Sequence, residues 1–64
     1  MKEFSAGLPA DRTLLIVDDD APLRNRLARA LEKRNFLPEV AASVAEGIEL
    51  AAQRPPAYAI VDLR

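Results

Sequence analysis

The 64-residue chain contains no cysteine, no histidine and no tryptophan. Without cysteine, neither a disulfide framework nor a thiolate metal site can stabilise a chain of this size. Any metal site must use oxygen ligands, which favours hard cations such as Mg²⁺ over zinc. The usual nucleophile–base pairs of hydrolases, which need histidine or cysteine, are excluded as well.

The chain also lacks an excess of charge of one sign, and it has no long apolar run. Nine basic and ten acidic residues leave a net charge of −1, so nothing attracts the whole chain to nucleic acid or membrane. No apolar run could span a bilayer, and the first eight residues lack the apolar core of a signal peptide. No glycine-rich nucleotide-binding motif is present. We therefore expect a soluble cytoplasmic protein whose segment here binds neither nucleic acid nor membrane.

Apolar patterning predicts three strands after a flexible leader over residues 1–12. Leu14–Val17 is a run of branched apolar residues, typical of a strand that is buried on both faces. A weaker strand is predicted over 36–42, where Pro38 lacks an N–H to donate. A third apolar strand over 58–61 ends at Asp62.

Two helices are predicted between these strands. The first spans 21–34, with Asp20 as N-cap, and Asn35 tolerates the left-handed conformation that ends helices. The second runs from the Ser43–Glu46 capping box to about residue 54. Their apolar sides are expected to be buried: Leu23, Leu27, Ala30 and Leu31 in the first, and Val44, Gly47, Ile48, Ala51 and Ala52 in the second. The order β-α-β-α-β predicts an α/β fold with a parallel sheet and right-handed crossovers.

Aspartates follow two of the predicted strands. Asp18, Asp19 and Asp20 end the first strand, and Asp62 ends the third. Because unpaired ionised carboxylates are costly to bury, we expect the first three to open onto water, a cation or a helix start. The carboxyl ends of adjacent parallel strands lie side by side, so Asp18 and Asp19 should meet Asp62. Such a cluster can hold Mg²⁺, and one carboxylate can act as a nucleophile toward phosphorus.

The motifs Val17-Asp18-Asp19 and Ile60-Val61-Asp62, with the elements between them, resemble the receiver domain of response regulators in two-component signalling. From about residue 11 onward, the segments 11–20, 30–36 and 54–64 are similar to redox-responsive regulators of the RegA/PrrA/ActR type. The resemblance implies a partial flavodoxin-like α/β fold with three parallel strands in the order 2-1-3. Residues 13–64 would form the N-terminal portion of an incomplete receiver domain.

The same resemblance implies a function and a set of site residues. Asp62 would be the phosphoacceptor of a sensor histidine kinase, which makes the chain a signalling module and not an enzyme. Asp19 would hold Mg²⁺ directly, and Asp18 partly through water. Asp62 and the backbone carbonyl of Arg64 would complete the set of protein ligands.

The family's other features would lie beyond residue 64. These are two further strands with their Ser/Thr and Lys, and a helix-turn-helix DNA-binding domain, so the parent protein would regulate transcription. This segment alone is therefore not expected to be competent for phosphotransfer. Its third strand, exposed at the edge of the sheet, is expected to favour self-association.

Two other functions are compatible with the residues. Asp18-Asp19-Asp20 contains the D-x-D spacing of haloacid-dehalogenase-type phosphatases, although Ala21-Pro22 replaces the residues expected next. A basic helix carrying Arg24, Arg26 and Arg29 would suit an interaction fragment that occupies a kinase partner. The simplest interpretations are that Asp20 caps a helix, that Asp62 is a turn residue and that the arginines form a solvated face.

Overall fold

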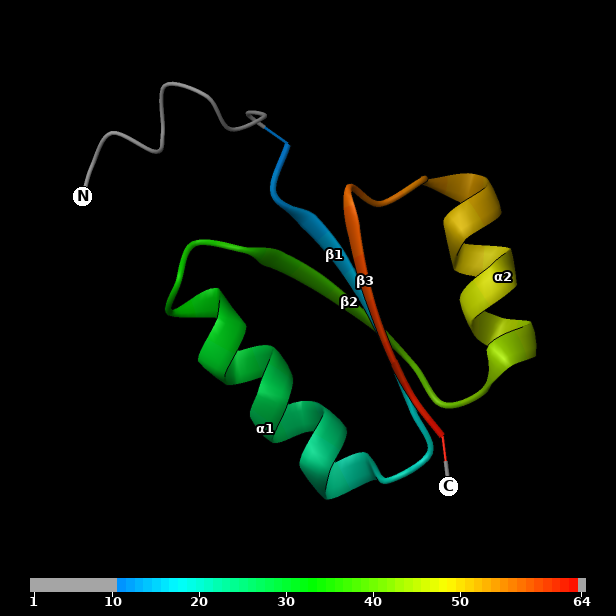
Figure 1. Cartoon of the computed structure of the whole chain (residues 1–64), viewed down its shortest axis with the longest axis horizontal. Coiled ribbons are helices and arrows are strands. Elements are labelled where there is room, and N and C mark those ends of the chain that lie inside the picture. The colour runs from blue at the N-terminus through cyan, green and yellow to red at the C-terminus, as the bar shows by residue number, and fades with distance from the viewer. Residues whose placement is uncertain (1–10, 64) are drawn as a thin grey trace.

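The computed structural model of the chain describes residues 11–63. Its elements are β1 (Thr13–Asp18), α1 (Ala21–Glu32), β2 (Leu37–Ala41), α2 (Val44–Gln53) and β3 (Tyr58–Asp62). The strands form one parallel sheet in the order β2-β1-β3, and Figure 1 shows α1 and α2 on opposite sides of it. The predicted partial flavodoxin-like arrangement is confirmed. Most of the predicted leader, residues 1–10, lies outside the described residues.

The central strand β1 supplies most of the core. Leu14, Leu15, Ile16 and Val17 are all at most 6% exposed, and Ile16 is fully enclosed. β1 pairs with β2 on one side and β3 on the other, while α1 and α2 cover its two faces. The run of branched apolar residues is therefore buried on both faces, as predicted.

Helix α1 is covered less completely than its apolar stripe predicts. Leu23, Leu27 and Leu31 are half-buried, whereas Ala30 is exposed. The helix packs against β1 and β2, so the side of the stripe that carries Ala30 lies outside this contact. The prediction of one buried stripe was wrong for Ala30.

Helix α1 ends at Glu32, two residues before its predicted end. The amide of Phe36 donates to the carbonyl of Leu31 (3.1 Å), and the amide of Asn35 donates to that of Glu32 (3.0 Å). This pair of bonds is the Schellman motif, which needs a residue in the left-handed conformation. Asn35 is that residue, with φ 71°, as its sequence position predicted.

Helix α2 begins at the predicted N-cap, Ser43, and the returning bond of Glu46 goes to the residue before this cap. The Ser43 hydroxyl accepts the Glu46 amide (3.2 Å), and the Glu46 carboxylate reaches back to accept the amide of Ala42 (2.9 Å). Gly47, one turn later, is buried against β1. A Cβ on Gly47 would lie 2.8 Å from Cγ2 of Val17, so the absence of a side chain permits this close approach.

The remaining apolar side of α2 is open. Val44 and Ile48 are 48% and 64% exposed, and Ala52 is exposed too, so the prediction that this side is buried was wrong for them. With Val61 of β3, which is 60% exposed, Val44 and Ile48 line an apolar groove of about 180 Å³. β3 adds little cover because it contacts β1 and does not pack against α2.

The amino-terminal end of the sheet is fixed by polar and aromatic contacts. The backbone carbonyl and the hydroxyl of Thr13 both accept the amide of Ala57, at 3.1 and 3.0 Å. The rings of Phe36 and Tyr58 meet edge to face at 5.6 Å, and the Arg12 guanidinium lies over Phe36. The Tyr58 side chain therefore packs against Phe36. No helix in residues 11–63 is long and apolar enough to cross a membrane.

Candidate acid site at the carboxyl edge of the sheet

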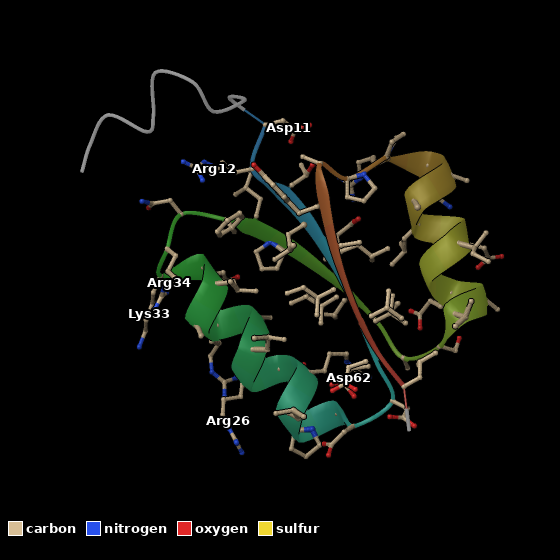
Figure 2. All side chains as sticks on the ribbon, viewed as in Figure 1. Asp11, Arg12, Arg26, Lys33, Arg34 and Asp62 are labelled. Carbon is tan, nitrogen blue, oxygen red and sulfur yellow. The ribbon has the colours of Figure 1, made fainter. Side chains whose placement is uncertain are left out.

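Two of the predicted site residues lie side by side where strands β1 and β3 end. Asp18 and Asp62 are register partners in this parallel pair. Side chains alternate along a strand, and Leu15, Val17 and Val61 line the groove under α2. Asp18 and Asp62 consequently project toward the opposite face, which α1 covers. Figure 2 shows Asp62 at this edge, near the turn that leads from β1 into α1.

Asp18 is buried, with only 1% of its surface exposed. Its Oδ1 accepts the backbone amide of Asp20 at 2.9 Å, so the carboxylate is paired although it is enclosed. The three acids were expected to open onto water, a cation or the start of a helix, and Asp18 meets the last of these, because it is enclosed and bonds the backbone of the α1 N-cap. A carboxylate can be buried at this position because the turn supplies a hydrogen-bond donor, which offsets part of the desolvation cost.

The other two acids of the turn differ from Asp18 and from each other. Asp19 is exposed to solvent. Asp20 is the N-cap of α1, and its Oδ1 accepts the amide of Leu23 at 3.1 Å. The capping role predicted for Asp20 is confirmed, so its carboxylate is already used by the helix.

Arg24 also belongs to this site, and sequence reasoning did not find it. Its Nη1 donates to the backbone carbonyl of Asp18 at 2.9 Å. The sequence interpretation placed Arg24 on a solvated basic face, whereas the structure places it partly buried against the turn. The available signal was its position one turn after Asp20, which brings a long side chain within reach of the end of β1.

Oxygen ligands at this edge suit a hard cation. Mg²⁺ usually takes one or two carboxylates and keeps several waters, and Asp18 and Asp62 form such a pair, with Asp19 following Asp18 in the chain. Within residues 11–63, no three acidic, histidine or cysteine side chains come close enough to form a metal-binding group. The metal-binding roles of Asp18, Asp19 and Asp62 stay predictions. Arg64, whose carbonyl was the fourth predicted ligand, lies outside the described residues.

The basic side chains of α1 outside this site face solvent. Figure 2 shows Arg26 of α1, together with Lys33 and Arg34 that directly follow the helix, on the side that points away from the sheet. All three are exposed. They form a separate positively charged face, which agrees with the interpretation of a solvated helix surface.

Several regulatory proteins are similar to the chain. It is 65% identical over 57 residues to the photosynthetic apparatus regulatory protein RegA of Cereibacter sphaeroides, a match over 89% of this chain and 31% of that protein. RegA of Rhodovulum sulfidophilum is 58% identical over the whole chain, which matches 35% of its length. The acid tolerance regulatory protein ActR of Rhizobium meliloti is 59% identical over 54 residues, with 84% of this chain and 28% of ActR covered. No protein-family model and no solved structure matches the chain.

These similarities confirm the resemblance drawn from the acid motifs. The chain matches a receiver fragment of response regulators of the RegA and ActR type. It spans about one third of the length of the two RegA proteins, 31% and 35%. The relatives support a receiver module of a two-component regulator, which favours this interpretation over a phosphatase of the haloacid-dehalogenase type.

Proposed function

We propose that the chain is the phosphoryl-accepting part of a two-component response regulator, with Asp62 as the acceptor. The observation that carries the proposal is the register pairing of Asp62 with Asp18 at the carboxyl edge of the sheet. Asp62 is exposed, so a phosphoryl donor can approach it, whereas Asp18 is enclosed and Asp20 caps α1. Asp19 is exposed as well, but we assign it to the cation, so of the acids that the structure describes at this edge we assign the attack on phosphorus to Asp62.

In the proposed reaction, a carboxylate oxygen of Asp62 attacks the phosphorus of a phosphohistidine on a sensor kinase. The new O–P bond forms as the P–N bond breaks, and the imidazole that leaves takes up a proton. Bound Mg²⁺ would screen the negative charge of the phosphoryl group. Asp19 and Asp62 would hold the cation, and Asp18 would assist through water. The chain acts here as a phosphoryl acceptor in the cytoplasm and not as an enzyme, and the parent protein controls transcription.

The test is phosphorylation by a small-molecule donor in the presence of Mg²⁺. The protein is incubated with acetyl phosphate and Mg²⁺ and analysed by intact-mass spectrometry, both as this chain and within the longer regulator. We expect one phosphoryl adduct on the longer regulator, which Asp62→Asn abolishes and Asp19→Asn reduces. Asp11→Asn is a matched control because Asp11 is an exposed aspartate at the opposite end of β1. An adduct that survives Asp62→Asn, or none on the longer regulator, refutes the proposal.

We further propose that this chain associates with copies of itself through the outer edge of β3. β3 pairs on one side with β1 and is the last strand of the sheet that the structure describes. Val61 of β3 and Leu63, which follows the strand, are 60% and 48% exposed, and exposed apolar edge strands favour pairing with another chain. Light scattering should show a mass that rises with concentration and falls in Val61→Lys. A monomer at all concentrations would rule this out.

A further inference from the structure

We propose that Arg24 is a positioning residue that sets the geometry of the acid site and thereby its affinity for Mg²⁺. The inference rests on the proposed function, because it concerns the cation that Asp18, Asp19 and Asp62 would hold. It assigns a function to an arginine whose position on a basic helix suggested only a solvated surface.

The side chain of Arg24 bonds the first residue of the turn that carries the acids, and its backbone amide makes the ordinary helical bond to the last. Its backbone amide donates to the carbonyl of Asp20 at 2.8 Å, and its Nη1 donates to the carbonyl of Asp18 at 2.9 Å. Within the turn, the amide of Asp20 donates to Oδ1 of Asp18. These three bonds tie the end of β1 to the first turn of α1.

A hydrogen bond to the Asp18 carbonyl restricts the conformation of this turn more than a bond to a side chain would. This carbonyl belongs to the peptide group that joins Asp18 to Asp19, and a peptide group is planar and rigid. Fixing its oxygen therefore fixes the orientation of the plane between the two residues. The directions in which the Asp18 and Asp19 carboxylates leave the backbone follow from that orientation.

The burial of Arg24 indicates that its side chain is more than a surface charge. Its Nε is buried and has no hydrogen-bond partner among the described residues. A buried donor left unpaired costs about 1–3 kcal/mol, so a freely mobile arginine would turn toward solvent. The guanidinium stays against the turn, where Nη1 makes a charge-assisted bond.

A positioning role and a purely electrostatic role for Arg24 predict opposite changes in Mg²⁺ affinity when the arginine is removed. If Arg24 acted only through its positive charge, removing it would strengthen Mg²⁺ binding at the neighbouring carboxylates. If it acts by holding the Asp18 carbonyl, removing it frees the turn and weakens binding. Groups that orient metal ligands typically change metal affinity about 10–100-fold when they are substituted.

The experiment compares Arg24→Met with the matched control Arg26→Met. Methionine and arginine have similar helix propensities, and Arg26 is exposed on the same helix. Backbone amide exchange of Asp20 is measured by NMR without metal, and the amides of the turn are then followed during a Mg²⁺ titration. We expect Arg24→Met to speed Asp20 exchange and to weaken Mg²⁺ binding about tenfold. Arg26→Met should change neither.

A conservative variant keeps the comparison usable if Arg24→Met does not fold. Arg24→Lys retains a donor nitrogen and the charge but loses the planar fork, so its affinity for Mg²⁺ should lie between wild type and Arg24→Met. Unchanged exchange at Asp20 in a folded variant, or tighter Mg²⁺ binding, overturns the positioning role. Mg²⁺ binding that is equally tight in wild type and in Asp62→Asn refutes the proposed function instead. In that case the exchange rate of the Asp20 amide, measured without metal, still decides whether Arg24 positions the turn.

Discussion

Replacing Gly47 with alanine is expected to destabilise the chain, although alanine is the better helix former. Helix propensity alone favours Gly47→Ala by about 1 kcal/mol. The added Cβ, however, would lie 2.8 Å from Cγ2 of Val17, which is far closer than an ordinary van der Waals contact. Overpacking a core in this way typically costs about 1–3 kcal/mol. The expected net loss is therefore about 0–2 kcal/mol, because overpacking outweighs propensity.

Val17 cannot easily turn away from an added methyl group. It is 3% exposed on the central strand, and its branched Cβ restricts χ1. The other neighbours of such a Cβ, Ala41 and Leu15, lie at an ordinary 3.8 Å. The whole conflict thus lies between position 47 and one methyl group of Val17. Val17→Ala removes that methyl group, so the double variant should be more stable than the sum of the two single losses predicts.

Urea unfolding followed by far-UV circular dichroism measures these differences. With a slope of about 1 kcal/mol per molar urea, a loss of about 1 kcal/mol lowers the midpoint by about 1 M. Ala52→Gly, at an exposed position of the same helix, measures the propensity term without the contact. A Gly47→Ala chain that is more stable than wild type by the full propensity term would refute the reasoning. Such a result would mean that α2 can move away from the sheet, to make room for the added Cβ, without a loss of stability.

Three further predictions concern the ends of the elements. Asp20→Ala removes the acceptor of the Leu23 amide and should lower the free energy of unfolding by about 1 kcal/mol in urea titrations. Asn35→Ala places a Cβ residue without a polar side chain at φ 71° and should cost about 1–2 kcal/mol, whereas Asn35→Gly should be tolerated. Hydrogen bonds from the Thr13 hydroxyl and amide lower the pKa of Asp11 below its usual 3.8, so Asp11 adds stability above pH 3.8 that is lost as pH falls through the lowered pKa.

Each of these predictions has a result that would contradict it. Asp20→Ser keeps a capping oxygen, so a loss equal to that of Asp20→Ala would show that the cap is unimportant. Asn35→Gly should be at least as stable as Asn35→Ala, and the reverse order would exclude the left-handed conformation. NMR titration of the Asp11 carboxylate should give a pKa that rises toward 3.8 in Thr13→Val. No rise on losing the hydroxyl would assign the shift to another cause.

Element order and helix ends could be predicted from the sequence because their causes are local. Asp20 caps α1 through an amide three residues away, the Ser43 hydroxyl accepts the Glu46 amide, and the Glu46 carboxylate accepts the amide of Ala42 four residues earlier. The helix end at Asn35 likewise depends on bonds to residues within the preceding turn and a half. Interactions over so short a stretch are set by the residue types and their spacing alone.

The burial of individual helix side chains could not be predicted from the sequence, because it depends on how much of the sheet covers them. The apolar period of α2 identifies the side that faces the sheet, which Gly47 and Val17 confirm. It does not indicate how much surface the sheet offers there, so Val44 and Ile48 were expected to be buried and are exposed. Arg24 was missed for a related reason. Helical spacing places its Cα on a face, but its long side chain can lie along the helix toward Asp18 or toward solvent.

The acid pair depends on the register of the core residues that precede it on both strands. Ile16 and Ile60 are register partners two residues before Asp18 and Asp62, and Ile16 is fully enclosed. A slip of β3 by one residue would turn every one of its side chains to the other face, so Asp62 would leave the side that Asp18 occupies. The free energy that keeps Ile60 on the α1 side therefore also keeps the two carboxylates together. The apolar residues before each aspartate thus specify the site as firmly as the aspartates do.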